Sequence, residues 1–168
     1  FLKTLPKREI ICGYGEIFKH SLILNTNLFK YLNNNSSNIF NLKSPFIEKA
    51  IFESCKIKKK VVQKDEKEKN IRKILNFGHT FGHAYEASLG YSSKLNHGEA
   101  VILGISSATK FSQDNKILNY NDAILISKHI NKISSKFSLK NFFKKTSIKK
   151  IIKFMATDKK NSDDKVNL

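Results

Sequence analysis

The spacing of apolar residues constrains this chain's fold most strongly. Over most of its length they recur every three or four residues, as they do along the buried face of an α-helix. No stretch alternates between apolar and polar residues for long enough to support a β-sheet, and no internal repeat is visible. We therefore predict one all-α domain over residues 1–168, with about six or seven helices.

Turn residues and polar clusters predict the breaks between these helices. Residues 25–38 are rich in Asn and Ser and are expected to contain a loop. Ser44-Pro45 supplies a cap and a first-turn residue for a helix that runs to Cys55. The charged run 56–69 is expected to form a solvated hairpin, a strand-like connector or a lid over a charged ligand. The helical pattern returns over residues 71–89, and the remaining helices are expected at 98–111, 122–133 and 148–154.

The net charge of +17 bears on the kind of partner that the chain binds. A charge of this size favours a polyanion, a membrane surface or a phosphorylated substrate. Nearly all of it comes from Lys, however, in a chain that is also rich in Asn and Ile, as proteins from AT-rich genomes are. We therefore expect most of the lysines to lie on solvated helix faces. We expect neither a nucleic acid nor a membrane as partner.

Further features of the sequence indicate the cellular compartment and whether the chain is part of a longer protein. The two cysteines form no disulfide framework and no CxxC pair, which favours a cytoplasmic protein. No apolar run is long enough for a membrane span, and no secretory leader opens the sequence. The sequence begins at Phe1, and its first residues resemble the middle of a folded unit, so we expect a fragment of a longer protein.

Three histidines lie close together in the chain, beside glycines that allow a close approach. His79 and His83 are four residues apart, so both imidazoles project from one face of the expected helix. Two nitrogens at that spacing can bind one divalent metal. His97 is a third candidate ligand, and Glu86 could orient an imidazole from outside the ligand set. His129 is predicted to be a surface residue, and the sequence leaves His20 undecided.

A metal site of this kind also needs an anionic ligand. Glu16 lies near a helix start, where the helix dipole favours a carboxylate, so it is either a ligand or a simple cap. Two His and one Glu with an open position form the ligand set of catalytic zinc.

Cationic and amide side chains surround these candidate ligands in the sequence. Arg72 is placed two helical turns before His79, Asn76 one turn before it, and Lys19 about one turn after Glu16. Each could equally belong to a solvated helix face. As a set, they suit a phosphorylated, hydroxyl-rich substrate better than a nucleic acid.

These residues resemble a known family, the 3-dehydroquinate synthases. Residues 72–86 are similar to its RxxLNxGHTxGHAxE motif, and residues 95–101 to its HGEAV element. Residues 61–68 resemble its VVxxDExE element, and residues 155–160 its late MxxDKK segment. Near the start, residues 4–9 and 16–19 resemble TLPxRE and AEVIK. The motifs follow in the family's order and span almost the whole chain.

The resemblance implies a role for each matching residue. The metal ligands fall on Glu16, His79 and His97, so His83 becomes a neighbouring imidazole that relays protons or positions water. This differs from the pairing that spacing alone favours. Catalytic roles also fall on Lys19 and Arg72. Substrate-binding positions fall on Lys58 and Asn76, and on one residue of the pair Lys159 and Lys160.

The implied reaction converts 3-deoxy-D-arabino-heptulosonate 7-phosphate, a phosphorylated sugar acid, to 3-dehydroquinate and phosphate in the shikimate pathway. The implied cofactors are NAD and a divalent metal, zinc or cobalt, in a homodimeric enzyme. The resemblance covers the family's helical C-terminal domain only. The Gly-rich segments of its N-terminal α/β NAD-binding domain do not occur in these residues, so we expect the chain alone to be inactive.

The sequence departs from the family's pattern at two places. Asn70 stands where a Gly usually precedes the Leu/Ile-Arg pair, and Asn tolerates a positive φ. His20-Ser21 stands where a Tyr-Gly or similar pair is commoner.

Other functions remain open from the sequence. Other sugar-phosphate cyclases, such as 2-deoxy-scyllo-inosose synthase, share the GHTxGHA and HGEA elements. Metal-dependent alcohol dehydrogenases share the two-domain plan but lack the phosphate-binding Arg and Lys residues. A basic helical nucleic-acid-binding protein is the alternative from a different class, and it predicts salt-dependent binding without a metal.

Overall fold

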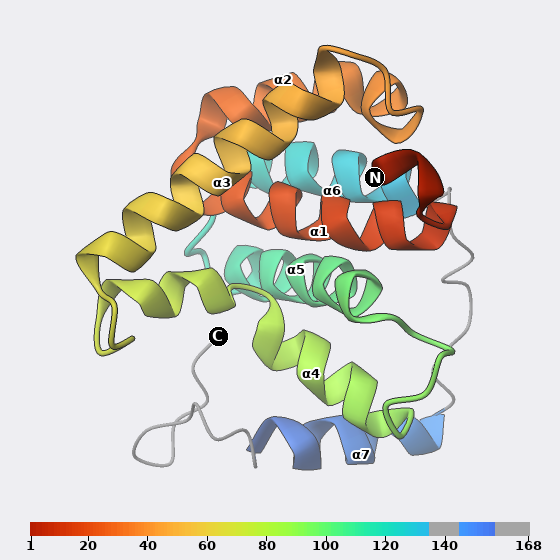
Figure 1. The fold of residues 1–168 in the computed structure, drawn as a ribbon. Helices are drawn as coiled ribbons and strands as arrows, with labels where there is room; N and C mark the ends of the chain where they lie inside the picture. Colours follow the sequence, from red (N-terminus) through yellow and green to blue (C-terminus); the bar gives the residue numbers. More distant parts are fainter. Residues whose placement is uncertain (135–144, 157–168) are drawn as a thin grey trace. The chain divides into compact units, whose positions relative to one another are not determined.

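A computed structural model of the chain describes residues 1–134 and 145–156. These residues form seven α-helices and two short 3-10 helices and contain no strand, which confirms the predicted all-α fold (Figure 1). Contacts divide the chain into two compact units, Phe1–Phe77 and Gly78–Leu168. Within the described parts of the chain, no helix combines the length and the apolar character needed to cross a bilayer.

The first unit packs three long helices against one another. It is composed of η1 (Leu2–Thr4), α1 (Lys7–Leu24), α2 (Thr26–Phe40), α3 (Phe46–Lys64) and η2 (Ile71–Asn76). Helices α1, α2 and α3 contact each other pairwise, and η2 contacts both α1 and α3. Phe18 of α1, Leu32 of α2, and Ala50 of α3 are fully buried in this core.

Helix α2 corrects the prediction of a loop in residues 25–38. Asn25 begins the helix because its side-chain oxygen accepts a hydrogen bond from the Leu28 backbone N–H at 2.9 Å. Leu28, Leu32 and Ile39 then recur at helical spacing on the buried face. The Asn and Ser cluster mostly occupies the other faces of the same helix, where polar side chains meet water. An Asn- and Ser-rich stretch can therefore be helical where apolar residues recur at helical spacing within it.

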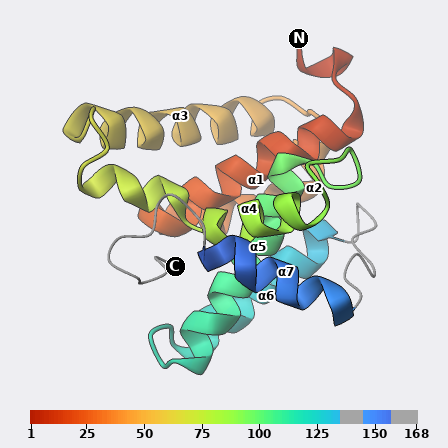
Figure 2. The same ribbon diagram turned by 90° about the horizontal axis from the view of Figure 1, so that it is seen from below.

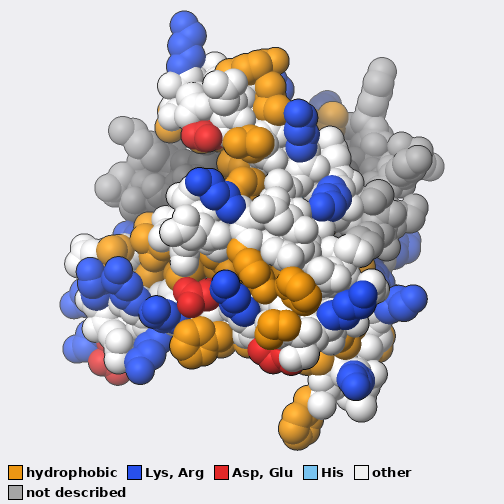
Figure 3. Space-filling model, turned by 90° about the horizontal axis from the view of Figure 1, so that it is seen from above, with side chains coloured by type: hydrophobic (Ala, Val, Ile, Leu, Met, Phe, Trp, Pro, Cys, Tyr) orange, Lys and Arg blue, Asp and Glu red, His pale blue; other side chains and the backbone are white. Residues whose placement is uncertain are grey.

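The charged run 56–69 is also mainly helical, because α3 continues to Lys64. Ile57 and Val61 face the core, while the lysines between them are exposed. Figure 3 shows Lys and Arg side chains spread over the face that it views, interrupted by apolar and uncharged groups. The predicted hairpin or strand-like connector is therefore wrong for most of this run.

A carboxylate organises the turn from α3 to η2. The Asp65 side chain accepts hydrogen bonds from the backbone N–H groups of Lys69, Asn70 and Arg72, at 2.9, 2.7 and 3.0 Å. These bonds, with the one from Arg72 largest, lower the pKa of the Asp65 carboxyl below its ordinary value. The Asp65 side chain therefore stabilises this turn and fixes the position of Arg72 in the first turn of η2.

The predicted single helix over residues 71–89 is interrupted. Residues Ile71–Asn76 form a 3-10 helix, and Gly78 then takes a left-handed conformation with φ 77°. Helix α4 (His79–Ser88) begins only after this glycine. Arg72 and Asn76 therefore do not share a helix face with His79, contrary to the spacing argument.

The second unit is built around the contact between α4 and α5. It contains α4, α5 (His97–Asp114), α6 (Tyr120–Ser134) and α7 (Lys145–Ala156). Helix α4 contacts both α5 and α7, and α5 contacts α6. Figure 2 shows α7 crossing beside α4. The three helices predicted at 98–111, 122–133 and 148–154 are thereby confirmed, with ends that differ by a few residues.

Glycines allow α4 and α5 to approach closely. A Cβ added to Gly104 would lie 1.9 Å from the Gly78 carbonyl oxygen, and one added to Gly82 would lie 3.0 Å from the Ala100 carbonyl oxygen. Tyr85 and Ser107 join the same two helices through a hydrogen bond of 2.5 Å between their hydroxyls. The backbones of the two helices are therefore in direct contact, without side chains to separate them.

His129 is not the surface residue predicted from the sequence. It is fully buried in α6, beside the apolar residues Ile130 and Ile133. Burial, and secondarily the charge of Lys132, lower its pKa from 6.5 to about 4. The lysines of the same helix, which suggested a solvated face, lie on its other sides.

Replacing Gly104 with Ala should destabilise the second unit by about 3 kcal/mol or more, because the new methyl group meets the backbone of Gly78. The matched control is Gly13→Ala in α1, where an added Cβ meets nothing within 4 Å. That change should stabilise the helix by about 0.5 to 1 kcal/mol. Urea denaturation followed by circular dichroism measures both. Equal effects of the two substitutions would contradict the close contact.

Acid should weaken the second unit through His129. Its folded pKa of about 4 lies below 6.5, so between these values the unfolded state takes up a proton that the folded state does not. Stability is therefore lost as pH falls below about 6.5. From pH 7 to pH 5 the free energy of unfolding should fall by about 1 to 2 kcal/mol more than in His129→Gln. Urea titrations at the two pH values measure this difference, and equal falls would contradict it.

Candidate metal and substrate site

Three histidines come together in the second unit. His79 and His83 are one turn apart on α4, with ring centroids 5.3 Å apart, and His97 is the first residue of α5. The His97 ring lies 5.3 Å from that of His79 and 5.9 Å from that of His83. The structure therefore confirms that these three imidazoles cluster, as their order in the sequence predicted.

Glu86 holds His97 in place within this cluster. Its Oε2 atom lies 3.0 Å from Nδ1 of His97, and the Glu86 side chain is only 13% exposed. A carboxylate on Nδ1 leaves Nε2 of the same ring available to bind a metal. Glu86 was predicted to orient an imidazole, and the structure identifies that imidazole as His97.

The donor set of the second unit fits a divalent metal of the zinc type. His83, Glu86 and His97 each offer a ligand atom, and these atoms lie within 4.8 Å of one another. Bonds from zinc to such nitrogen and oxygen ligands are about 2.0 to 2.2 Å long, so groups this close together can serve one ion, either as ligands or, like Glu86, by orienting a ligand. Imidazole nitrogens and carboxylate oxygens are ligands that zinc and cobalt both accept.

Glu99 follows His97 closely in sequence, but it has a structural role. Its carboxylate accepts a hydrogen bond of 2.8 Å from the Asn96 backbone N–H, in a capping box that begins α5. The Glu99 side chain is buried. The cap fixes the first turn of α5 and with it the position of His97.

In the first unit, Glu16 and Lys19 form an ion pair. Lys19 Nζ lies 2.7 Å from Glu16 Oε2, across one turn of α1, as their spacing predicted. The Lys19 side chain is only 4% exposed, while that of Glu16 is 35% exposed. A buried ammonium requires such a partner, since an isolated buried charge is strongly unfavourable.

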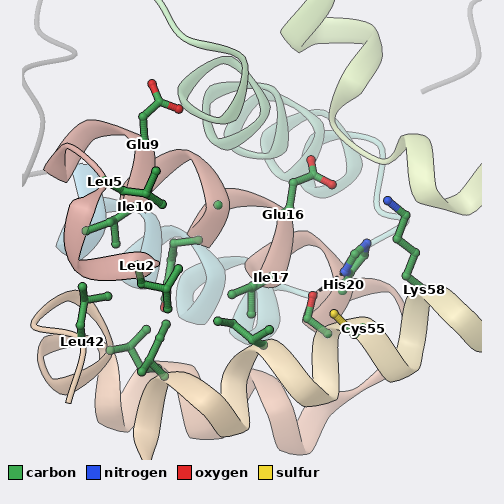
Figure 4. Close-up of a pocket in the computed structure, with 16 residues that line it drawn as sticks. Leu2, Leu5, Glu9, Ile10, Glu16, Ile17, His20, Leu42, Cys55 and Lys58 are labelled. Carbon is green, nitrogen blue, oxygen red and sulfur yellow. Dashed lines mark hydrogen bonds between the residues drawn. The ribbon is translucent and has the colours of Figure 1, made fainter. Parts of the chain in front are cut away.

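A pocket of about 310 Å³ lies in the first unit, next to this ion pair (Figure 4). Most of its wall is apolar, with side chains from η1, α1 and α3 and from the end of α2. Glu16, His20 and Lys58 come together at one end. Pockets of this size that combine apolar walls with a few polar groups commonly bind small molecules.

His20 and Ser54 are site residues that the sequence did not reveal. His20 Nδ1 lies 2.7 Å from Ser54 Oγ in a buried hydrogen bond that joins α1 to α3. Ser54 is four residues before Lys58, so the two lie on one face of α3. The sequence did contain a signal, because a histidine stands at position 20, where the family more often has another residue such as Tyr.

Arg72 and Asn76 lie in the first unit and bind acidic or carbonyl partners there. Arg72 Nη1 donates to the Glu66 carbonyl oxygen at 2.7 Å, and its Nε lies 3.9 Å from a Glu68 carboxylate oxygen. Asn76 Nδ2 donates to Glu68 Oε1 at 3.0 Å. A guanidinium has five N–H donors, so Arg72 retains capacity for a further anion. Lys159 and Lys160, predicted for substrate binding, lie outside the described residues.

Comparisons with known proteins find relatives over almost the whole chain. Residues 13–161 match the family model described as 3-dehydroquinate synthase C-terminal. A 3-dehydroquinate synthase of Pelagibacter ubique (strain HTCC1062) is 57% identical over 168 residues, which is 100% of this chain and 46% of that protein. Proteins of the same name from Thermoanaerobacter sp. (strain X514) and Dictyoglomus thermophilum are 41% and 40% identical over 99% of this chain and 45% of their own length.

The fold and the site together define an all-helical domain with three clustered histidines, one of which is hydrogen-bonded to a carboxylate. The chain belongs to the 3-dehydroquinate synthase family and corresponds to its C-terminal part. It spans about half the length of the curated relatives that it matches.

Replacing Glu86 with Gln should weaken metal binding by about ten- to a hundredfold, because the charge that orients His97 is lost. Asp114→Asn is the matched control, since that carboxylate pairs with Lys110 at the exposed end of α5. Calorimetric titration of the complete chain with Zn²⁺ measures both affinities. If Glu86→Gln and the control bind Zn²⁺ equally, Glu86 does not position a ligand.

Proposed function

We propose that the protein containing this chain is a 3-dehydroquinate synthase, a lyase of aromatic amino acid biosynthesis. It would convert 3-deoxy-D-arabino-heptulosonate 7-phosphate to 3-dehydroquinate and phosphate. The observation that carries the proposal is the cluster of His79, His83 and His97, with Glu86 on His97, in a chain of this family. We also expect a cytoplasmic homodimer.

We propose Glu16, His79 and His97 as the metal ligands and His83 as the neighbouring proton carrier. When bound, a zinc or cobalt ion would polarise the hydroxyl group that is oxidised, and NAD would accept and return its hydride. The relatives are longer than this chain, and we propose that NAD binds mainly to residues outside these 168. The chain alone would then bind metal and substrate without turnover.

His83 suits a role in proton transfer because of its chemistry and its place. An imidazole exchanges protons near neutral pH, and this one lies 5.3 Å from His79 and 5.9 Å from His97, centroid to centroid. It could hold a proton at a ring nitrogen while the substrate hydroxyl changes its protonation state. Positively charged Lys19 would raise the acidity of a nearby hydroxyl and balance the charge of Glu16.

The anionic groups of the substrate need cations and amide donors. Arg72 offers N–H groups beyond those that it uses on Glu66 and Glu68, in a geometry suited to phosphate or carboxylate. The Lys58 side chain is exposed at the polar end of the pocket, where a ligand can reach it. We propose that Lys58, Asn76 and one of Lys159 and Lys160 bind substrate oxygens.

The full-length protein should release phosphate from the heptulosonate phosphate in a reaction that needs NAD and a divalent metal. Glu16→Gln and His97→Ala should each lower kcat/KM by about a thousandfold or more and reduce bound metal. Glu48→Gln, an exposed carboxylate on α3, is the matched control and should change neither. Phosphate release and elemental analysis of the purified variants provide the two measurements.

Two results would contradict this proposal in different ways. Turnover of glucose 6-phosphate or sedoheptulose 7-phosphate, without turnover of the heptulosonate phosphate, would identify another sugar-phosphate cyclase. Equal metal content in the wild type, Glu16→Gln and His97→Ala would show that the ligand set is wrong.

A further inference from the structure

A buried histidine of the first unit lies beside a lysine that the proposed function assigns to substrate binding. His20 is 4% exposed, and its Nδ1 is 2.7 Å from Ser54 Oγ. Lys58 follows Ser54 by one turn of α3 and lines the same end of the pocket. In the view of Figure 4 the Lys58 side chain runs beside the His20 ring, on the side away from Ser54.

The surroundings keep the His20 ring neutral. Its pKa falls from 6.5 to about 4, first because of burial and then because of Lys19, with a smaller contribution from Lys58. Glu16 acts in the opposite direction without cancelling these effects. A neutral imidazole has one N–H donor and one acceptor nitrogen. Its two neighbours therefore decide which nitrogen carries the proton.

The chemistry of those neighbours selects one tautomer. A lysine ammonium can only donate hydrogen bonds, whereas a serine hydroxyl can either donate or accept. Because Ser54 Oγ lies on Nδ1, Nε2 is the nitrogen left for Lys58, and beside an ammonium group it can act only as an acceptor. In that arrangement the proton would lie on Nδ1, which would donate to Ser54 Oγ.

We propose that His20 is a positioning residue for Lys58. Ser54 fixes the ring, and the Nε2 lone pair attracts the ammonium group and holds it at the polar end of the pocket. Lys58 keeps two further N–H groups for oxygens of an anionic substrate, here a phosphate or carboxylate. The inference rests on the proposed function only in the identity of that substrate.

A neutral ring is better suited to this task than a charged or apolar one. A protonated His20 would repel Lys58 and add an uncompensated charge to a buried position. An apolar ring of similar size would fill the space, but it would leave the four-carbon lysine stem free to take many rotamers. Pre-ordering the amine before the substrate arrives reduces the entropy lost on binding.

The tautomer can be measured without any activity. In ¹⁵N NMR spectra of the complete chain, His20 should be in the Nδ1–H form at pH 7. In Lys58→Met, which removes the amine from an exposed position, the Nε2–H form should gain population. Lys64→Met, an exposed lysine farther along α3, is the matched control and should leave the His20 signals unchanged. An Nε2–H ring in the wild type, or no response to Lys58→Met, would overturn the inference.

Kinetics of the full-length protein provide the second test. His20→Phe should raise KM for the phosphorylated substrate about tenfold and change kcat less than about threefold. His20→Gln, whose amide oxygen can take the place of Nε2, should restore part of the lost affinity. In a double-mutant cycle, His20→Phe should add little to the effect of Lys58→Met, because His20 acts only through the amine that Lys58→Met removes.

The two tests separate the inference from the proposed function. If the tautomer responds to Lys58→Met but KM does not respond to His20→Phe, then His20 positions Lys58 and Lys58 is not a substrate contact. If the full-length protein has no activity on the heptulosonate phosphate, the NMR result still decides the role of His20. Additive effects of His20→Phe and Lys58→Met on KM would overturn the positioning role.

Discussion

The contact between the backbones of α4 and α5 determines whether the histidine cluster can exist. Gly104 allows the Gly78 carbonyl to approach it so closely that even a methyl group would not fit. His79 follows Gly78 directly, and His83 follows Gly82, which faces the Ala100 carbonyl. His97 lies on the first turn of the opposite helix. Larger side chains at the glycines would separate the helices and move the imidazoles beyond the reach of one ion.

Carboxylates organise both units, although the chain is strongly basic. Glu99 caps α5 at the turn that carries His97, and Glu86 fixes the ring of His97. In the first unit, Asp65 gathers three backbone N–H groups before Arg72, and Glu16 neutralises the buried Lys19. Each of these acids acts on a residue of the candidate site or on the turn that carries it. The chain has only 14 acidic residues beside 31 basic ones, so the placement of its acids is informative.

The sequence predicted the fold class and the histidine cluster because both depend on local periodicity and on short motifs. It failed at α2, where polar residues on the outer faces concealed the buried stripe of Leu28, Leu32 and Ile39. It also failed between residues 71 and 89, because apolar periodicity continues across a 3-10 helix and a left-handed glycine. The hydrogen bond between His20 and Ser54 was unpredictable, since 34 residues separate its partners and only tertiary packing brings them together.

The difference between local sequence patterns and tertiary contacts also explains why composition was a weak guide to function. Most of the described lysines are exposed, and exposed charges are screened and contribute little on their own. Lys19 differs because it is buried on an acidic partner, and Lys58 differs because it lines a pocket together with a buried imidazole that is hydrogen-bonded to Ser54. Their chemistry comes from the groups that surround them, because burial and a fixed partner strengthen an electrostatic interaction that water would otherwise screen. A lysine's functional meaning therefore follows from its neighbours in the fold, and the total charge of the chain does not supply it.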